Sequence, residues 1–323
     1  MPKKSPRASA RRKSTPTKRP RRAGPLRRYR PKPATKKPRP TAHAAGRRAF
    51  AVEEVQAPYV ALPPGAQAVL PLPSAPGAAR EAQPFLKWVG GKAQLLLQFD
   101  RFFPAAIERY VEPFIGGGAV FFHLKHRFPA MRAFLRDNNA DLLAAYQAVR
   151  DHPHELMRRL DAHLARFRTD RETYYYLVRS RHHLPVTEVV ERAARMIFLN
   201  KTCFNGLWRV NARGEFNVPI GSQLNPNLYD RENIHAASLA LQDVHLAVQD
   251  FRDTFNEIRS GTFAYIDPPY FPISPTASFT AYTKDEFGIG EQHELAALYS
   301  DAARRGAKLM LSNSDPPPPR CHS

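Results

Sequence analysis

The stretch that decides the fold is Ala264-Tyr265-Ile266-Asp267-Pro268-Pro269-Tyr270, an apolar run that ends in an acid, two prolines and an aromatic residue. Prolines cannot donate ladder hydrogen bonds, so a buried strand is expected to end at Asp267. They also restrict the residue before them, which stiffens the turn. The stretch therefore predicts a carboxylate, carbonyl oxygens and an aromatic ring at the carboxyl end of a strand, where open α/β sheets place their sites. A plain Pro-Pro turn with a solvated Asp267 is the alternative.

Strand and helix patterns alternate on both sides of this stretch. Residues 110–120 are typical of a strand, a glycine-rich turn and the start of a helix, and residues 131–137 predict a second strand. Residues 241–251 and 307–314 are two further strand patterns, and residues 291–305 have helical spacing. Strands that alternate with helices indicate a doubly wound, Rossmann-like α/β sheet.

The glycine-rich turn is Glu112-Pro113-Phe114-Ile115-Gly116-Gly117-Gly118. Its glycines let a ligand approach the backbone closely, while the following helix start offers free N–H groups. Asp137 follows Gly116 by 21 residues and ends the second strand, a spacing that suits the ribose hydroxyls in nucleotide-binding βαβ units. An ordinary turn, with Asp137 capping the next helix, is the alternative interpretation.

This turn does not match two common nucleotide sites. The chain has no G-x-x-x-x-G-K-[ST] stretch, so a P-loop phosphate site is not indicated. A nicotinamide-type G-x-G-x-x-G pattern also fails, because Phe121 stands at the third glycine position. We interpret the turn as part of a site for an adenosyl group that carries no phosphates, that of S-adenosylmethionine.

The folded part is expected to begin at Pro84 and to continue through Phe85-Leu86-Lys87-Trp88-Val89-Gly90-Gly91-Lys92. The glycine pair permits a tight turn, and Lys92 opens a helical pattern. A helix start with a lysine and a tryptophan nearby suits an anionic or a cationic ligand. Gly-Gly-Lys also occurs in plain turns, so this segment alone does not define a site.

Residues 198–221 are polar, rich in Asn, Gly and Arg, and contain several aromatic residues. Asn205-Gly206 and Arg213-Gly214 predict tight turns or hairpins. Arg and Asn side chains bind guanine and adenine edges, so this segment is a candidate nucleic-acid contact, with a solvated β-ribbon as the alternative. Residues 141–200 have helical spacing, and we expect Tyr174-Tyr175-Tyr176 to belong to the helix core.

The net charge of +20 is concentrated at the N-terminus. Residues 1–50 contain 19 of the 49 Lys and Arg residues and no Asp or Glu. Such a segment cannot bury enough apolar surface to order itself, so we predict a disordered polybasic tail and a Pro- and Ala-rich linker over residues 51–83. The tail attracts polyanions through counterion release, which favours non-specific nucleic-acid attachment. A tail without a selected role is the alternative.

The composition also bears on metal chemistry and compartment. Cys203 and Cys321 are the only cysteines, too few for a disulfide framework or a zinc site. No apolar run approaches the ~20 residues of a membrane span, and none follows the basic N-terminus as in a secretory signal. We therefore expect a soluble, intracellular protein, cytoplasmic and nucleoid-associated in a prokaryote, with no metal and no membrane partner.

Taken in order, these motifs resemble those of the DNA adenine-N6 methyltransferases of the Dam type. Residues 85–92 are similar to the family's N-terminal cofactor motif, residues 112–118 to its F-x-G-x-G motif, and Asp267-Pro268-Pro269-Tyr270 to its catalytic motif. The resemblance covers about residues 84–315. It implies a methyltransferase domain in two pieces around an inserted, largely helical target-recognition domain, with the ranges 84–145 and 235–315 for the first and 146–234 for the second.

The resemblance assigns site residues in three groups. S-adenosylmethionine would be bound by Trp88, Lys92, Glu112, Pro113, Phe114, Gly116, Gly118, Asp137, Asp250, Phe251 and Asp267. The catalytic residues would be Asp267, Pro268, Pro269 and Tyr270. Double-stranded DNA would be contacted by Asn205, Leu207, Arg209, Asn211, Arg213 and Pro219.

The catalytic motif suits direct methylation of an exocyclic adenine amine, whose lone pair is delocalised into the ring. Hydrogen bonds from the amine to the Asp267 carboxylate and the Pro268 carbonyl would localise that lone pair for in-line attack on a sulfonium methyl group. The base must first leave the duplex, and Tyr270 offers it a stacking face. A cytosine-C5 enzyme would need a nucleophilic thiol, typically after a proline, and neither cysteine follows one.

The chain departs from the family in two places. Residues 222–226 lack the basic residues expected there, so GATC is a candidate target that the resemblance does not establish. After Ser314 the family continues with a helix and an antiparallel hairpin, whereas here residues 316–319 are four prolines and the sequence stops at Ser323. We expect an atypical, truncated end over residues 316–323, with sheet elements missing and with lowered stability or activity.

Two other functions stay open on these residues. The same motif serves other exocyclic amines, so cytosine N4 or RNA adenine is a second candidate target, although the motif order and the inserted segment argue against it. A truncated, non-catalytic nucleic-acid binder that keeps the fold is the third candidate. Binding of S-adenosylmethionine would distinguish the enzymes from this binder.

Overall fold

The computed structural model describes residues 80–182, 184–270 and 287–313. The described residues all belong to one compact unit of the chain, Gly65–Ser323. The predicted polybasic tail, the linker up to residue 79 and the truncated end therefore lie outside the described residues.

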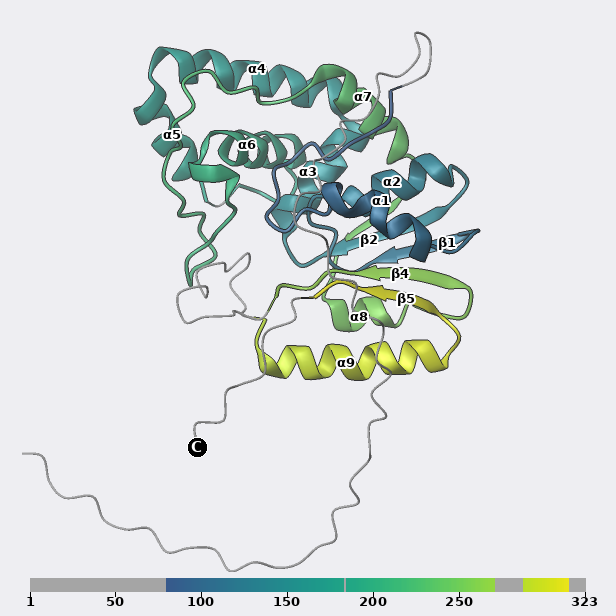
Figure 1. Ribbon diagram of the computed structural model, residues 1–323. Coiled ribbons are helices and arrows are strands. Elements are labelled where there is room, and N and C mark those ends of the chain that lie inside the picture. Colours follow the sequence, from purple (N-terminus) through teal and green to yellow (C-terminus); the bar gives the residue numbers. More distant parts are fainter. Residues whose placement is uncertain (1–79, 183, 271–286, 314–323) are drawn as a thin grey trace, which may run out of the picture. The chain divides into compact units, whose positions relative to one another are not determined.

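A five-stranded parallel sheet is the framework of the described part (Figure 1). Its strands are β1 (Arg109–Glu112), β2 (Arg132–Asp137), β3 (His245–Val248), β4 (Thr262–Ile266) and β5 (Lys308–Leu311). The spatial order is β3-β2-β1-β4-β5, so the direction of winding reverses between β1 and β4. The predicted doubly wound α/β sheet is confirmed, and this order favours ligand binding outside the carboxyl ends of β1 and β4.

Helices connect the strands. The described helices are η1 (Ala93–Leu95), α1 (Leu96–Phe99), η2 (Asp100–Phe102), α2 (Ala119–Arg127), α3 (Ala140–Asp151), α4 (Pro153–Thr169), α5 (Arg171–Arg179), α6 (Val189–Thr202), η3 (Phe204–Gly206), α7 (Arg231–Ala240), α8 (Phe251–Phe255) and α9 (Ile289–Arg304). Helices α3 to α7 all lie between β2 and β3 in the sequence, so this long segment is largely helical. The side chain of Asn139 caps α3 by accepting the N–H groups of Asp141 and Leu142.

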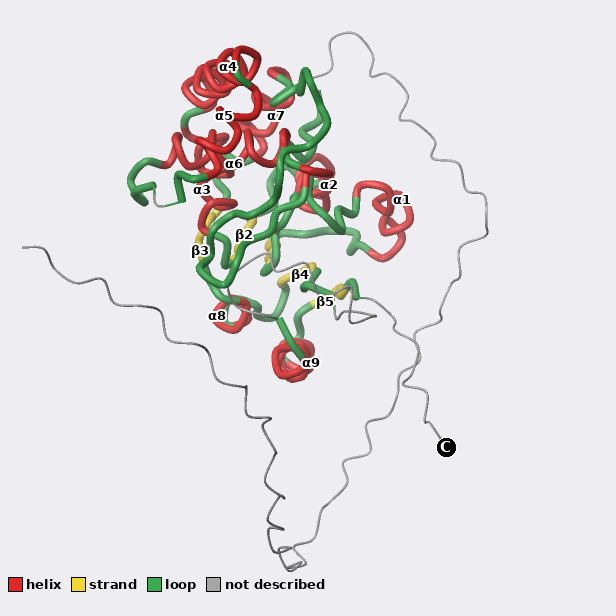
Figure 2. Tube along the Cα trace, turned by 90° about the vertical axis from the view of Figure 1, so that its left-hand side faces the viewer, coloured by secondary structure: helices red, strands yellow, loops and turns green. Residues whose placement is uncertain are grey.

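The two faces of the sheet bury separate hydrophobic cores, because side chains alternate along each strand. In β4, Phe263 and Tyr265 belong to a core that includes α2 and helices α3 to α7, whereas Ala264 and Ile266 belong to a second core with α8 and α9. Figures 1 and 2 show these helices on opposite sides of the sheet. Every residue of β4 is buried, as expected for a parallel strand that is covered on both faces.

Contacts reach upstream of residue 84, where we placed the start of the folded part. The N–H of Gln83 donates to Asn233 Oδ1 at 2.9 Å, and Asn233 Nδ2 donates to the Gln83 carbonyl at 3.0 Å. Arg80 forms an ion pair with Asp230 at 2.9 Å. The last described residues before 84 are thus attached to the start of α7.

The tyrosine triplet lies on α5. Tyr175 is fully buried, and its Oη donates to the Val218 carbonyl at 2.9 Å. Tyr174 and Tyr176 are half-buried, and Tyr174 Oη forms a hydrogen bond with His163 Nδ1 at 2.9 Å. The predicted core position is therefore confirmed for Tyr175, with its two neighbours at the margin of the core.

We predict that Gly118→Ala lowers the free energy of unfolding by about 2–4 kcal/mol. Gly118 has a left-handed φ of 71°, which is unfavourable for alanine, and a Cβ there would lie 2.5 Å from Tyr146 Oη. Denaturant unfolding measures the loss.

Gly214→Ala is the matched control, because Gly214 has a φ of 79° and nothing within 4 Å of the added Cβ. Its free energy of unfolding should fall by about 1 kcal/mol, the cost of a left-handed backbone conformation for alanine. Equal losses in the two variants would contradict the close contact with Tyr146.

Candidate active site

The carboxyl ends of the parallel strands bring the predicted site residues to one edge of the sheet. In strand order from β3 to β5, the residues at or just after the strand ends are Asp250, Asp137, Glu112, Asp267 and Ser312. Glu112 begins the glycine turn after β1, and Asp267 follows β4, so both lie where the winding reverses. Segments far apart in the sequence thus meet at the position that the strand order favours for a ligand.

An ion pair joins the N-terminal motif to the acid-proline-proline-tyrosine turn after β4. Lys92 Nζ lies 2.5 Å from Asp267 Oδ2 and donates to the Gly90 carbonyl at 2.6 Å. The side chain of Lys92 is 7% exposed and that of Asp267 is 21% exposed. Asp267 Oδ1 is buried and has no hydrogen-bond partner among the described residues. The lysine therefore holds one oxygen of the carboxylate, and no described residue donates to the other within hydrogen-bond distance.

Burial and the ion pair act in opposite directions on Asp267. Burial raises the pKa of its carboxyl group above the usual value, and the charge of Lys92 opposes this rise without cancelling it. Burial lowers the pKa of Lys92, but the charge of Asp267 and the hydrogen bond to it leave that pKa above its ordinary value. The lysine thus stays protonated and favours the ionised form of the carboxyl group.

Tyr270 lies beside this pair with accessible surface. Lys92 Nζ is 5.1 Å from the centroid of the Tyr270 ring, and Tyr270 Oη forms a hydrogen bond with Ser312 Oγ at 2.9 Å. The residue is 40% exposed. Pro268 is buried, and the Pro269 carbonyl accepts a hydrogen bond from Gln292 Nε2 at 3.1 Å. Helix α9 therefore supports the proline turn, while the aromatic ring keeps exposed surface.

Trp88 packs on the glycine turn. A Cβ at Gly116, whose φ is 47°, would lie 2.8 Å from the indole ring, and a Cβ at Gly117 would lie 3.1 Å from Trp88 Cβ. Tyr146 Oη donates to the Gly116 carbonyl at 3.1 Å. The glycines therefore allow the N-terminal motif to lie directly against the turn that follows β1.

Two further carboxyl groups lie at the ends of β2 and β1. Asp137 accepts the N–H of Gly116 at 3.4 Å and the N–H of Asn139 at 3.0 Å. Burial raises the pKa of Asp137 to about 6, and these backbone N–H groups oppose the rise. Glu112 is 2% exposed, accepts from Tyr110 Oη at 2.7 Å, and has a pKa that burial raises well above its usual value. This edge of the sheet therefore carries one buried and two half-buried carboxyl groups, those of Glu112, Asp137 and Asp267.

The residues predicted to hold the adenine of the cofactor lie near β3. Phe251 is 4% exposed and stacks on Phe114 with ring centroids 5.6 Å apart, and Phe287 contacts both rings. Asp250 caps α8 by accepting the N–H of Arg252, and it forms an ion pair with that arginine at 3.2 Å. The Asp250 carboxylate is thus engaged at the start of α8.

A short hairpin follows α6. Two isolated antiparallel bridges, Cys203 with Ile220 and Val210 with Phe216, join its arms. Trp208 packs on Phe216 with ring centroids 4.7 Å apart. Burial raises the pKa of the Cys203 thiol to about 12, which is unfavourable for a nucleophile.

The predicted DNA-contact residues all lie on this hairpin. Asn205, Arg213 and Pro219 are exposed, whereas Leu207, Arg209 and Asn211 are half-buried. Arg209 Nε donates to Asn217 Oδ1 at 2.8 Å. Asn211 Oδ1 accepts the N–H groups of Arg213 and Glu215, at 2.9 and 3.0 Å, so its amide shapes the tip of the hairpin.

Asn200 connects the hairpin to the N-terminal motif, a role that its position in a helical pattern did not indicate. It is fully buried, its Oδ1 accepts the N–H of Lys87 at 2.8 Å, and its Nδ2 donates to the carbonyl groups of Lys87 and Gly206 at 2.7 and 3.1 Å. A buried asparagine in a run of apolar residues was the available signal. Its backbone partners only become evident in the tertiary structure.

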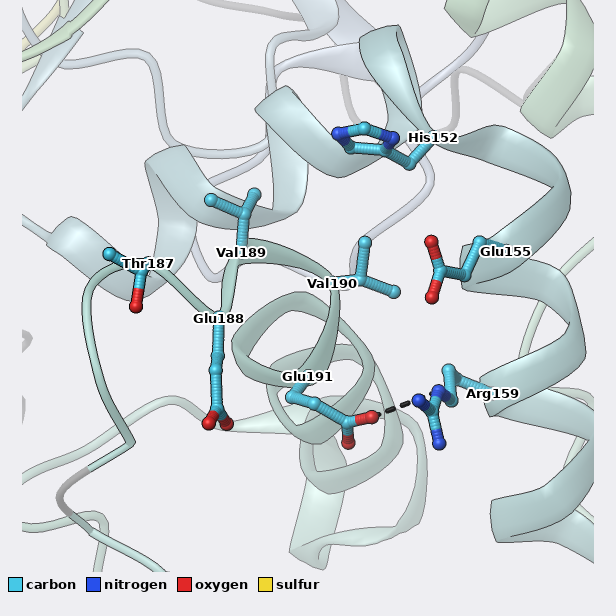
Figure 3. Close-up of a pocket in the computed structure, with 8 residues that line it drawn as sticks. All are labelled: His152, Glu155, Arg159, Thr187, Glu188, Val189, Val190 and Glu191. Carbon is cyan, nitrogen blue, oxygen red and sulfur yellow. Dashed lines mark ion pairs between the residues drawn. The ribbon is translucent and has the colours of Figure 1, made fainter.

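A small hollow lies elsewhere, between the starts of α4 and α6. Figure 3 shows the ion pair between Arg159 and Glu191 within it, at 2.9 Å, with Glu155 near the arginine. The lining residues are His152, Glu155, Arg159, Thr187, Glu188, Val189, Val190 and Glu191. None of these is a predicted site residue, and their charges are mostly paired or solvated.

Within the ranges that the structure describes, no three or more His, Cys, Asp or Glu side chains converge as ligands of a metal ion. No helix in the same ranges combines the length and the apolar character that a membrane crossing requires.

Comparison with known proteins assigns a family. Residues 88–320 match the family described as D12 class N6 adenine-specific DNA methyltransferase. The chain is 41% identical over 245 residues to the type II methyltransferase M.MjaIII of Methanocaldococcus jannaschii, an alignment covering 72% of this chain and 85% of that protein. It is 37% identical over 240 residues to the type II methyltransferase M1.LlaDCHI of Lactococcus lactis subsp. cremoris, covering 73% and 82%. It is 34% identical over 233 residues to a DNA adenine methylase of Serratia marcescens, covering 72% and 83%.

The parallel sheet, the glycine turn after β1 and the acid-proline-proline-tyrosine turn after β4 define an α/β methyltransferase. The family match covers most of the chain and includes both turns. The chain belongs to the D12 class N6 adenine-specific DNA methyltransferase family, and the resemblance inferred from the motifs is confirmed.

We predict that Asn200→Ala lowers the free energy of unfolding by about 2–4 kcal/mol, because it removes a fully buried side chain that binds the part-buried backbone groups of Lys87 and the buried carbonyl of Gly206. Asn138→Ala is the control, since Asn138 is exposed, and it should change stability by less than about 0.5 kcal/mol. Denaturant unfolding compares the two, and similar small losses would show that Asn200 does not support the fold.

Proposed function

We propose that this protein transfers a methyl group from S-adenosylmethionine to the N6 amine of adenine in double-stranded DNA. The observation that carries the proposal is the Asp267 carboxylate, whose Oδ2 is held by Lys92 and whose buried Oδ1 has no partner among the described residues. A buried acceptor without a donor is unfavourable, and an amine N–H satisfies it. Membership of the family and relatives named DNA adenine methylase support adenine as the base.

The carboxyl edge of the sheet fits a cationic cofactor that has no phosphates. Glu112, Asp137 and Asp267 supply carboxyl groups there, and a bound cation favours their ionised forms against the effect of burial. Gly116 and Gly118 have left-handed φ angles and let Trp88 and Tyr146 lie directly against the turn, which fixes its backbone beside these carboxyl groups. S-adenosylmethionine supplies an electrophilic methyl group on a positively charged sulfur.

The residues that would hold this cofactor are those assigned by the family resemblance. They are Trp88, Lys92, Glu112, Pro113, Phe114, Gly116, Gly118, Asp137, Asp250, Phe251 and Asp267. Asp137 also accepts the Gly116 N–H, so it would order the turn in addition to accepting ribose hydroxyls. Asp250 would share its carboxylate between the start of α8 and the adenine.

The target amine would donate to Asp267 Oδ1 and to the Pro268 carbonyl. Two acceptors on one amine localise its lone pair on nitrogen, which prepares the nitrogen for in-line attack on the methyl group. Lys92 favours the ionised carboxylate and holds Oδ2, which leaves Oδ1 to the substrate. Tyr270, with its exposed ring surface, would stack against the base after it leaves the duplex.

The hairpin would read the DNA sequence. Asn205, Arg213 and Pro219 are exposed on the hairpin and accessible to a duplex. Arg209, which is half-buried, would add a guanidinium group between them in the sequence. Asn211 would act mainly by shaping the tip that presents Arg213. The hydrogen bonds of Asn200 connect this hairpin to the segment that carries Lys92. The same asparagine would therefore help to position both the DNA-reading residues and the catalytic residues.

We predict that Asp267→Asn lowers kcat by a factor of about 10²–10³ or more, because an amide accepts the amine hydrogen more weakly than a carboxylate does. The measurement is the formation of N6-methyladenine in duplex DNA incubated with protein and S-adenosylmethionine. Asp301→Asn, a change in the last turns of α9, is the control and should keep full activity.

Methylation at wild-type rates by Asp267→Asn would overturn the mechanism. A wild-type product of N4-methylcytosine would overturn the choice of adenine. The same sequencing experiment reports the recognition sequence and tests GATC directly.

We predict that Lys92→Gln moves the acid limb of kcat/KM to higher pH by about 1–3 pH units. The Asp267 carboxyl group must be ionised to accept the amine, so activity falls as pH drops through its pKa. The charge of Lys92 lowers that pKa, and its removal therefore raises it. Lys308→Gln, an exposed change on β5, should leave the limb in place. If the acid limb of kcat/KM is unchanged in Lys92→Gln, or moves to lower pH, the ion pair does not control the pKa of the Asp267 carboxyl group.

A further inference from the structure

The segment that follows the hairpin is bound by arginines from the inserted helices. Residues 221–225 contain no Lys or Arg, although the family resemblance led us to expect basic residues from position 222 onward. Arg171, the first residue of α5, donates from Nη2 to the Gly221 carbonyl and from Nε to the Gln223 carbonyl at 3.2 Å. A cation from another part of the chain therefore lies against this segment.

A second arginine binds the same segment from the end of α4. Arg168 donates to Asn225 Oδ1 from Nη2 at 2.8 Å and from Nε at 3.2 Å. Helices α4 and α5 are consecutive and lie together with α6 (Figure 1). Leu224, between the two points of attachment, is 78% exposed, so the arginines hold a segment that stands open to solvent.

The hydrogen-bond partners of these two arginines do not neutralise their positive charges. The acceptors that they bind are carbonyl and amide oxygens, which are neutral. Among the described ion pairs none involves Arg168 or Arg171, and the neighbouring Asp170 carboxylate accepts the Thr173 N–H as the cap of α5. A guanidinium group has five N–H donors, and in both residues the protein bonds use only Nε and Nη2. Donors and charge therefore remain for an external anion.

We propose that Arg168 and Arg171 bind phosphates of the DNA backbone beside the recognition hairpin, in place of the basic residues that segment 221–225 lacks. This inference rests on the proposed function. Arginine is well suited to the role, because its planar fork matches phosphate oxygens. Pro219, a predicted DNA contact, is two residues before Gly221, so a duplex on the hairpin passes close to both arginines.

Phosphate contacts carry no sequence information, which distinguishes this role from base reading. Loss of either arginine should weaken binding to cognate and unrelated duplexes by the same factor. It should also reduce the salt dependence of binding, since each neutralised phosphate releases counterions.

The test measures the affinity of the full-length protein for two fluorescent duplexes, one cognate and one unrelated, at several salt concentrations. We expect Arg168→Gln and Arg171→Gln each to reduce the slope of log K against log salt concentration by about 0.9, for both duplexes. The basic tail is present in every variant, so its contribution cancels in the comparison. Arg158→Gln, an exposed change on α4, is the control and should keep the wild-type slope.

Lysine variants separate charge from structure. Arg168→Lys and Arg171→Lys keep the cation but lose the forked hydrogen bonds to the segment, and they should restore most of the slope. An unchanged slope in the Gln variants, or a failure of Lys to restore it, would overturn the proposal and leave the arginines as structural supports of the segment. A wild-type protein that neither binds nor methylates duplex DNA would instead overturn the proposed function, and this inference with it.

Discussion

The ion pair between Lys92 and Asp267 is the contact on which the site depends. It joins residues 175 positions apart, and the lysine side chain is 7% exposed. Removal of one partner of such a pair strands a charge in a poorly solvated place, which costs several kcal/mol. Because the lysine occupies Oδ2, the carboxylate offers one acceptor, Oδ1, in a defined position. An amine that must be oriented for in-line attack requires such an acceptor.

The segment that carries Lys92 also connects the other parts of the site. Trp88 packs on the glycine turn after β1, and the backbone of Lys87 is bonded to Asn200 at the base of the hairpin. One short segment therefore touches the proposed cofactor turn, the proposed catalytic carboxylate and the proposed recognition element.

Much of the fold followed from local patterns. The prolines after Asp267 end β4, and the alternation of strands and helices predicted the parallel sheet that the structure shows. Some boundaries differ, since the strand expected over residues 241–251 is limited to β3 (His245–Val248). The site was less predictable at the level of contacts. Asp250 caps a helix, and the Asn211 amide shapes its own turn, because a side chain that can bind a ligand can also bind the backbone near it.

The sequence by itself determined the class of this protein. Three motifs stand in order along the sequence: the glycine turn, the polar hairpin segment and the acid-proline-proline-tyrosine turn. Each can be recognised from its residue types, because the backbone preferences of these residues are local. Only the tertiary structure decided that Lys92 holds one oxygen of Asp267, that Asn200 supports the hairpin, and that two arginines lie against a segment without basic residues. These contacts join segments brought together by burial of the two cores, and packing between distant segments is not encoded in any local pattern.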